Sequence, residues 1–125
     1  MLLKFGSVAA LLLMFTAPAL ADNACTAPLA PAAVDGAKVT KAQMSSAHDD
    51  VVDFIKASDQ YQSCLFADLD KQRADAAKQK DPKPLDPSIE QGVQAKINAN
   101  QKMKEKVGGE YNAAVHAYKA AHPGG

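Results

Sequence analysis

The sequence predicts an all-α fold, in which two long helices form an antiparallel hairpin and a disulfide tethers a proline-rich N-terminal arm to it. Three observations predict this fold. Two apolar stripes recur at steps of three and four residues, a proline-rich segment separates them, and the chain holds only two cysteines. The two stripes place the hairpin domain at residues 40–121.

Residues 1–21 have the pattern of an export signal. Lys4 gives a basic start, residues 11–15 are apolar, Pro18 ends the apolar stretch, and residues 19–21 fit the cleavage rule for small side chains. The apolar stretch is shorter than the roughly 20 residues that a membrane span needs. We therefore expect cleavage after Ala21 and a periplasmic or secreted protein that keeps no integral membrane segment.

Residues 22–39 predict an extended arm. This segment contains Pro28, Pro31 and Gly36 and lacks helical periodicity. Asp35-Gly36 is typical of a turn, because both residue types favour turn conformations. The chain therefore reaches the first helix through an arm with one turn.

The first helix is expected at about residues 41–79. Thr40 is a good N-cap, and Gln43 stands where a capping box needs an acceptor that reaches back. The residues of its stripe repeat at helical spacing: Met44, Ala47, Val51, Phe54, Ser58, Tyr61, Leu65 and Leu69.

The segment 81–87 predicts a linker, and a second helix follows at about 88–120. Asp86 is a good N-cap and Pro87 a good first helical residue. The stripe of this helix has a mean step close to 3.6 residues: Ile89, Val93, Ile97, Asn100, Met103, Val107, Tyr111, Ala114 and Tyr118. Gly108-Gly109 falls inside the stripe and predicts a soft spot or bend. The short linker makes the helices antiparallel neighbours, packed as in a coiled coil.

The charge balance indicates neither nucleic-acid binding nor binding to an anionic membrane. The chain has 14 basic and 14 acidic residues, and loss of the export signal removes only Lys4 from this balance. The mature net charge is then near −1, and nucleic-acid binding proteins are typically basic.

The two cysteines predict a Cys25–Cys64 disulfide. They are too far apart for a Cys-x-x-Cys redox centre or a haem attachment motif, and the residues before Cys25 do not fit a lipid-attachment signal. A helix rises roughly 36 Å from Thr40 to Cys64, whereas an extended arm spans roughly 50 Å from Thr40 back to Cys25. The arm can therefore fold back along the first helix, and exported chains commonly form disulfides. We expect this bond to be structural.

The sequence contains no catalytic motif, so we predict no enzyme, no catalytic residues and no cofactor. Gly-x-Ser-x-Gly, His-Glu-x-x-His and phosphate-binding loops are all absent from the sequence. Met44 and His48 lie one helical turn apart, which makes them the candidates for a copper or zinc site. Packing of Met44 and solvation of His48 account for the same pattern, so no metal is predicted.

Three further apolar residues, Val52, Ile55 and Phe66, widen the apolar face of the first helix. A two-helix hairpin covers only one side of each helix, so this extra surface needs another cover. The arm, a second copy of the chain in a four-helix bundle, and a partner protein all fit. We predict that these residues form an interaction face.

Several motifs resemble a family of small exported proteins of Gram-negative bacteria that has no assigned activity. They are Cys25, Pro28 and Pro31, then residues 35–37, Gln43-Met44, the pattern from Val51 to Leu65, and the pattern from Asn100 to Lys119. The resemblance covers most of the mature chain except residues 70–90. It implies a periplasmic helical hairpin with a Cys25–Cys64 bridge, and it implies no reaction.

The sequence thus favours a non-enzymatic structural or interaction protein of the periplasm that acts through an apolar helix face. Two alternatives stay open. One is a small holdase-type stress chaperone, which would expose apolar surface in acid. The other is a metal-binding protein.

Overall fold

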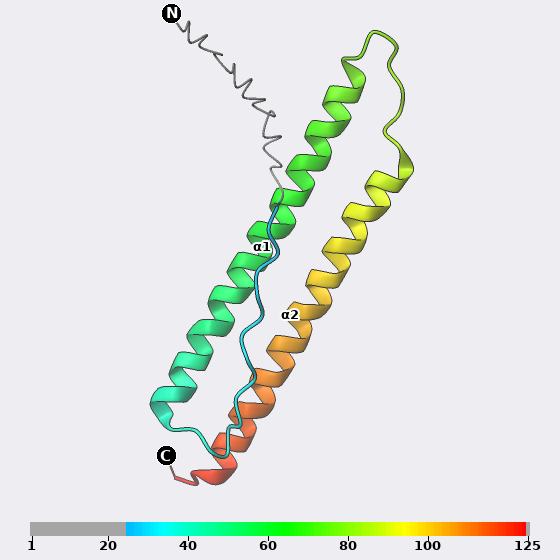
Figure 1. Ribbon diagram of the computed structural model, residues 1–125. Helices are drawn as coiled ribbons and strands as arrows, with labels where there is room; N and C mark the ends of the chain where they lie inside the picture. The colour runs from blue at the N-terminus through cyan, green and yellow to red at the C-terminus, as the bar shows by residue number, and fades with distance from the viewer. Residues whose placement is uncertain (1–24, 125) are drawn as a thin grey trace, which may run out of the picture.

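The computed structural model describes residues 25–124, which form two helices and no strand. Helix α1 spans Lys41–Ala77 and helix α2 spans Pro87–Ala121. The helices pack against each other as an antiparallel pair (Figure 1), so the predicted all-α hairpin is confirmed. Neither helix within residues 25–124 has an apolar stretch long enough to cross a bilayer. The predicted export signal, residues 1–21, lies outside the described residues.

Helix α1 begins at the capping box that the sequence predicts. The Thr40 hydroxyl accepts a hydrogen bond from the Gln43 backbone N–H at 3.2 Å, and the Gln43 side-chain oxygen accepts one from the Thr40 N–H at 2.8 Å. Both N–H groups would otherwise lack a partner in the first turn. The helix ends at Ala77, two residues before the expected end, because the Lys78 N–H turns to the Asp75 carbonyl at 3.2 Å and tightens the last turn.

Helix α2 begins at Pro87, the residue that the sequence predicts for the first helical position after the Asp86 N-cap. The Asp86 carboxylate accepts a hydrogen bond from the Ser88 N–H at 2.9 Å, and this bond lowers the pKa of Asp86. The helix continues through Gly108-Gly109, where the sequence predicts a soft spot or bend. Val107 and Ala114 are buried on either side of this pair, and their packing offsets the low helix propensity of glycine.

The core is formed by the inner faces of the two helices. Its members come from the two predicted stripes: Met44, Phe54, Leu65 and Leu69 of α1, and Val93, Ile97, Val107 and Ala114 of α2. An apolar cluster lies toward the linker, where Leu65 and Leu69 pack against Val93 and Ile97. Burial of these side chains is the main source of hairpin stability.

One layer of the core is polar. Ser58 is fully buried and Asn100 is 8% exposed. The Asn100 side-chain amide donates to the Ser58 hydroxyl oxygen at 3.1 Å, and the Gln62 amide donates to the Asn100 side-chain oxygen at 2.8 Å. A one-turn slip of the helices would bury these groups without partners, so the layer fixes the register of the hairpin.

The described part of the arm, residues 25–40, runs along the groove between the helices toward the start of α1 (Figure 1). A turn at Asp35–Lys38, closed by the Lys38 N–H and the Asp35 carbonyl at 2.9 Å, leads the chain into α1. In this turn Gly36 lies directly against α2. A Cβ atom at Gly36 would lie 1.8 Å from the carbonyl oxygen of Ala114, so only glycine allows this approach.

Candidate functional site

The Cys25–Cys64 disulfide holds the N-terminal end of the arm against the middle of α1. The two Cα atoms lie 5.7 Å apart, and residues 25–124 contain no free cysteine. The predicted pairing is therefore confirmed. Cys25 also packs against the apolar cluster around Leu65 and Leu69, so the bridge joins the arm to the core.

The described part of the arm, residues 25–40, covers one flank of the hairpin and leaves the other uncovered. Cys64 marks the flank of the arm, and Phe66, two residues later, points about 200° away around the helix. Val52 and Ile55 precede Phe66 by about four and three turns, so they lie on the same side of α1. We call the surface formed by Val52, Ile55 and Phe66 the open flank.

The open flank exposes large apolar side chains. Val52 is 47% exposed and Phe66 is 50% exposed, while Ile55 is half-buried. Coverage by the arm, one of the three possibilities drawn from the sequence, is therefore wrong. The disulfide at Cys64 directs the arm to the opposite flank. A second copy of the chain and a partner protein stay as candidates.

Polar side chains of α1 also lie on the open flank, where they contact α2. Asp59, Gln62 and Arg73 lie on the same side of α1 as Phe66. Asp59 forms an ion pair with Lys104, and Arg73 forms one with Glu90 at 2.9 Å. The bond to Glu90 raises the pKa of Arg73. Asp59 and Gln62 lie between Ile55 and Phe66 along α1, so apolar and polar side chains alternate on the open flank.

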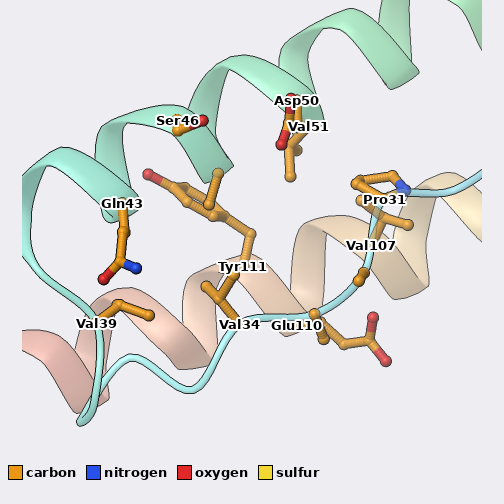
Figure 2. Close-up of a pocket in the computed structure, with 13 residues that line it drawn as sticks. Pro31, Val34, Val39, Gln43, Ser46, Asp50, Val51, Val107, Glu110 and Tyr111 are labelled. Atoms are coloured by element: carbon orange, nitrogen blue, oxygen red, sulfur yellow. The ribbon is translucent and has the colours of Figure 1, made fainter.

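A cavity of about 250 Å³ that is partly open to solvent lies on the other flank, between the arm and both helices. We call it the arm cavity. Its apolar walls are contributed by all three segments and include Pro31, Val34 and Val39 of the arm, Val51 of α1 and Val107 of α2 (Figure 2). The cavity therefore exists only while the arm lies in the groove.

Polar groups also line the arm cavity. Tyr111 projects from α2 toward α1, where Ser46 and Asp50 face the same space (Figure 2). The ring of His48 packs against the Tyr111 ring with centroids 5.9 Å apart, which restricts its position. Glu110 at the edge is paired with Lys106 at 2.9 Å. Within residues 25–124, Asp50 forms no ion pair, so its charge is left for a ligand or for water.

The two metal-ligand candidates have other roles in the structure. Met44 is buried in the core, where its side chain fills space between the helices. His48 is exposed, and its Nδ1 atom lies 3.2 Å from the Asp49 carboxylate. Among residues 25–124, no three or more His, Cys, Asp and Glu side chains are grouped in a way that can hold a metal ion.

The arm cavity is the feature that sequence reasoning missed. The sequence shows Tyr111 only as a member of the apolar stripe of the second helix. The signal in the sequence is the position of Cys64, about 200° around the first helix from Phe66, which with the predicted disulfide places the arm on the flank opposite Phe66 but does not show the cavity.

Comparison with protein-family models, curated proteins and solved structures gives no match.

Proposed function

We propose that this chain is a non-enzymatic interaction protein of the periplasm that binds a partner protein through the open flank. One observation carries the proposal. Val52 and Phe66 are each about half exposed on a rigid helix, on the flank that the arm leaves uncovered. Large apolar side chains grouped on one exposed face are typical of protein interaction sites.

The expected compartment rests on the sequence and on the disulfide. Residues 1–21 have the pattern of an export signal, and disulfides such as Cys25–Cys64 persist mainly in oxidising compartments. A short rigid hairpin suits a docking role, because its helix face is ordered before binding and loses little conformational entropy.

Site-specific photocrosslinking in living cells tests the proposal. A photoreactive benzoylphenylalanine replaces Phe66 in one variant and Leu29 in the control variant. Leu29 is 94% exposed and lies on the arm, so it is equally apolar but outside the open flank. We expect a discrete crosslinked band from position 66 and none from position 29.

The mass of the crosslinked product distinguishes the two remaining candidates for the molecule that covers the open flank. A product of two identical chains would show that a second copy covers the open flank, and a heteromeric product would show a separate partner. Equal crosslinking from positions 66 and 29 would contradict a specific face.

A further inference from the structure

We propose that the arm cavity is a binding site for a small amphiphilic amine, with the apolar part of the ligand between the arm and the helices and its ammonium group at Asp50. The cavity lies on the opposite flank from Val52, Ile55 and Phe66. This proposal therefore stands or fails independently of the proposed partner binding.

The size and lining of the cavity set the apolar part of the ligand. A protein cavity of about 150 Å³ holds a benzene molecule, so the arm cavity of about 250 Å³ holds about ten non-hydrogen atoms. Val34, Val51 and Val107 face this space from three different segments. Ligand sites are commonly apolar hollows of this kind with a few polar groups that set orientation.

The polar groups set the charge of the ligand. Asp50 lines the cavity as a carboxylate without an ion-pair partner among residues 25–124, whereas the nearby Glu110 is neutralised by Lys106. Ser46 and Tyr111 add hydroxyl groups on the same lining. A protonated amine can pair with Asp50, while a carboxylate ligand would be repelled.

The arm makes the site dependent on the disulfide. Residues 31–34 form most of one wall, and this segment is held between the Cys25–Cys64 bond at one end and the contact of Gly36 with Ala114 at the other. Cys64 is exposed, so a reductant can reach the bond. Reduction frees one end of the wall, and we expect ligand binding to weaken with it.

Titration of the oxidised protein with 3-phenylpropylamine, followed by NMR, tests the proposal. This amine has ten non-hydrogen atoms, and 3-phenylpropanol is its neutral match. We expect a Kd on the order of 0.1–1 mM for the amine. Binding of the alcohol is expected to be at least about fivefold weaker, because it lacks the charge that pairs with Asp50. Shift changes should centre on Val34, Val51 and Tyr111.

Three further samples make the result decisive. Asp50→Asn should remove the preference for the amine, while Asp59→Asn, which changes a carboxylate on the opposite flank, should leave it intact. Reduction of the disulfide should weaken binding at least about fivefold. Circular dichroism of each sample confirms that the helices are retained.

Several outcomes would overturn the proposal. They are no binding of the amine up to 10 mM (about ten times the weakest expected Kd), shift changes centred on Phe66, and equal binding of the amine and the alcohol by the wild-type protein. Unchanged binding after reduction would overturn the role of the arm as a wall of the site.

Discussion

At the scale of single residues, Gly36 carries the closest contact between the arm and the hairpin. Its missing side chain allows the turn to touch the backbone of α2, where an added Cβ would lie 1.8 Å from the Ala114 carbonyl oxygen. The atoms that a Cβ would meet are backbone atoms of Ala114, which cannot move aside as the end of a flexible side chain can. The contact therefore depends on glycine for space, and not for an unusual backbone angle.

Gly36→Ala is expected to destabilise the protein by about 1–3 kcal/mol, the usual cost of forcing extra atoms into a packed contact. The matched control is Gly92→Ala, because nothing lies within 4 Å of a Cβ at that position in α2. The control should stabilise the helix by about 0.5–1 kcal/mol. Urea denaturation of both variants measures the difference, and equal midpoints would contradict the close approach.

The Ser58–Asn100 hydrogen bond is the second feature that acts through single residues. Both side chains are buried, and they are bonded at 3.1 Å across the helix interface. Ser58→Ala and Asn100→Ala should each destabilise the hairpin, and the double variant should lose less than the sum of the two. We expect a coupling energy of about 1 kcal/mol in this double-mutant cycle. Additive losses would show that the pair does not cooperate.

At the scale of elements, each helix has a start signal that can be read from the sequence. Thr40 with Gln43 and Asp86 with Pro87 were predicted as helix starts, and both form the expected capping contacts. Capping is local, because it depends on residues within one turn. Continuity through Gly108-Gly109 was not predictable in this way, since it depends on how the flanking residues pack against α1.

The cap of α2 gives this element a defined response to pH. The hydrogen bond from the Ser88 N–H lowers the pKa of Asp86 in the folded protein relative to the unfolded chain. The folded state therefore binds its proton less tightly, and the stabilisation is present above the unfolded pKa, near pH 4. It is lost as the pH falls through the lower folded pKa.

Asp86→Asn tests this response, because asparagine can cap the helix but does not titrate in this range. At pH 6 we expect the wild type to melt at a higher temperature than the variant. This difference in melting temperature should disappear as the pH falls from 4 to 2. Thermal melts at several pH values, at one ionic strength, measure the difference. A gap that stays constant with pH would mean that the charge of Asp86 does not act on the cap.

At the scale of the whole molecule, the sequence alone was enough to predict the hairpin and its disulfide. The stripes at helical spacing defined the buried faces, and the arm was long enough to reach Cys64. The flank taken by the arm also follows from the sequence, because Cys64 lies about 200° around α1 from Phe66. The arm cavity was not predictable, since Val34, Val51 and Val107 come together only when three segments pack, and spacing within one segment does not show that packing.

The disulfide is expected to contribute a large part of the stability of the whole molecule. The hairpin has a thin core, and the bond joins residues that are 39 positions apart. In the chain-entropy model a closed loop of this length stabilises the folded state by about 4 kcal/mol, because it restricts the unfolded chain. For a protein of this size, removal of the bond and of this stabilisation lowers the melting temperature by about 20 °C.

The double variant Cys25→Ser/Cys64→Ser measures the stability contributed by the disulfide without a reductant. The reduced wild-type protein is the comparison sample. Both should melt at similar temperatures, well below the oxidised protein, and both should keep the helical circular dichroism signal at low temperature. The reason is that the cluster of Leu65, Leu69, Val93 and Ile97 holds the helices together independently of the bond. A drop of only a few degrees would mean that the unfolded chain is already restricted without the bond, and loss of helix at low temperature would mean that the arm is an integral part of the core.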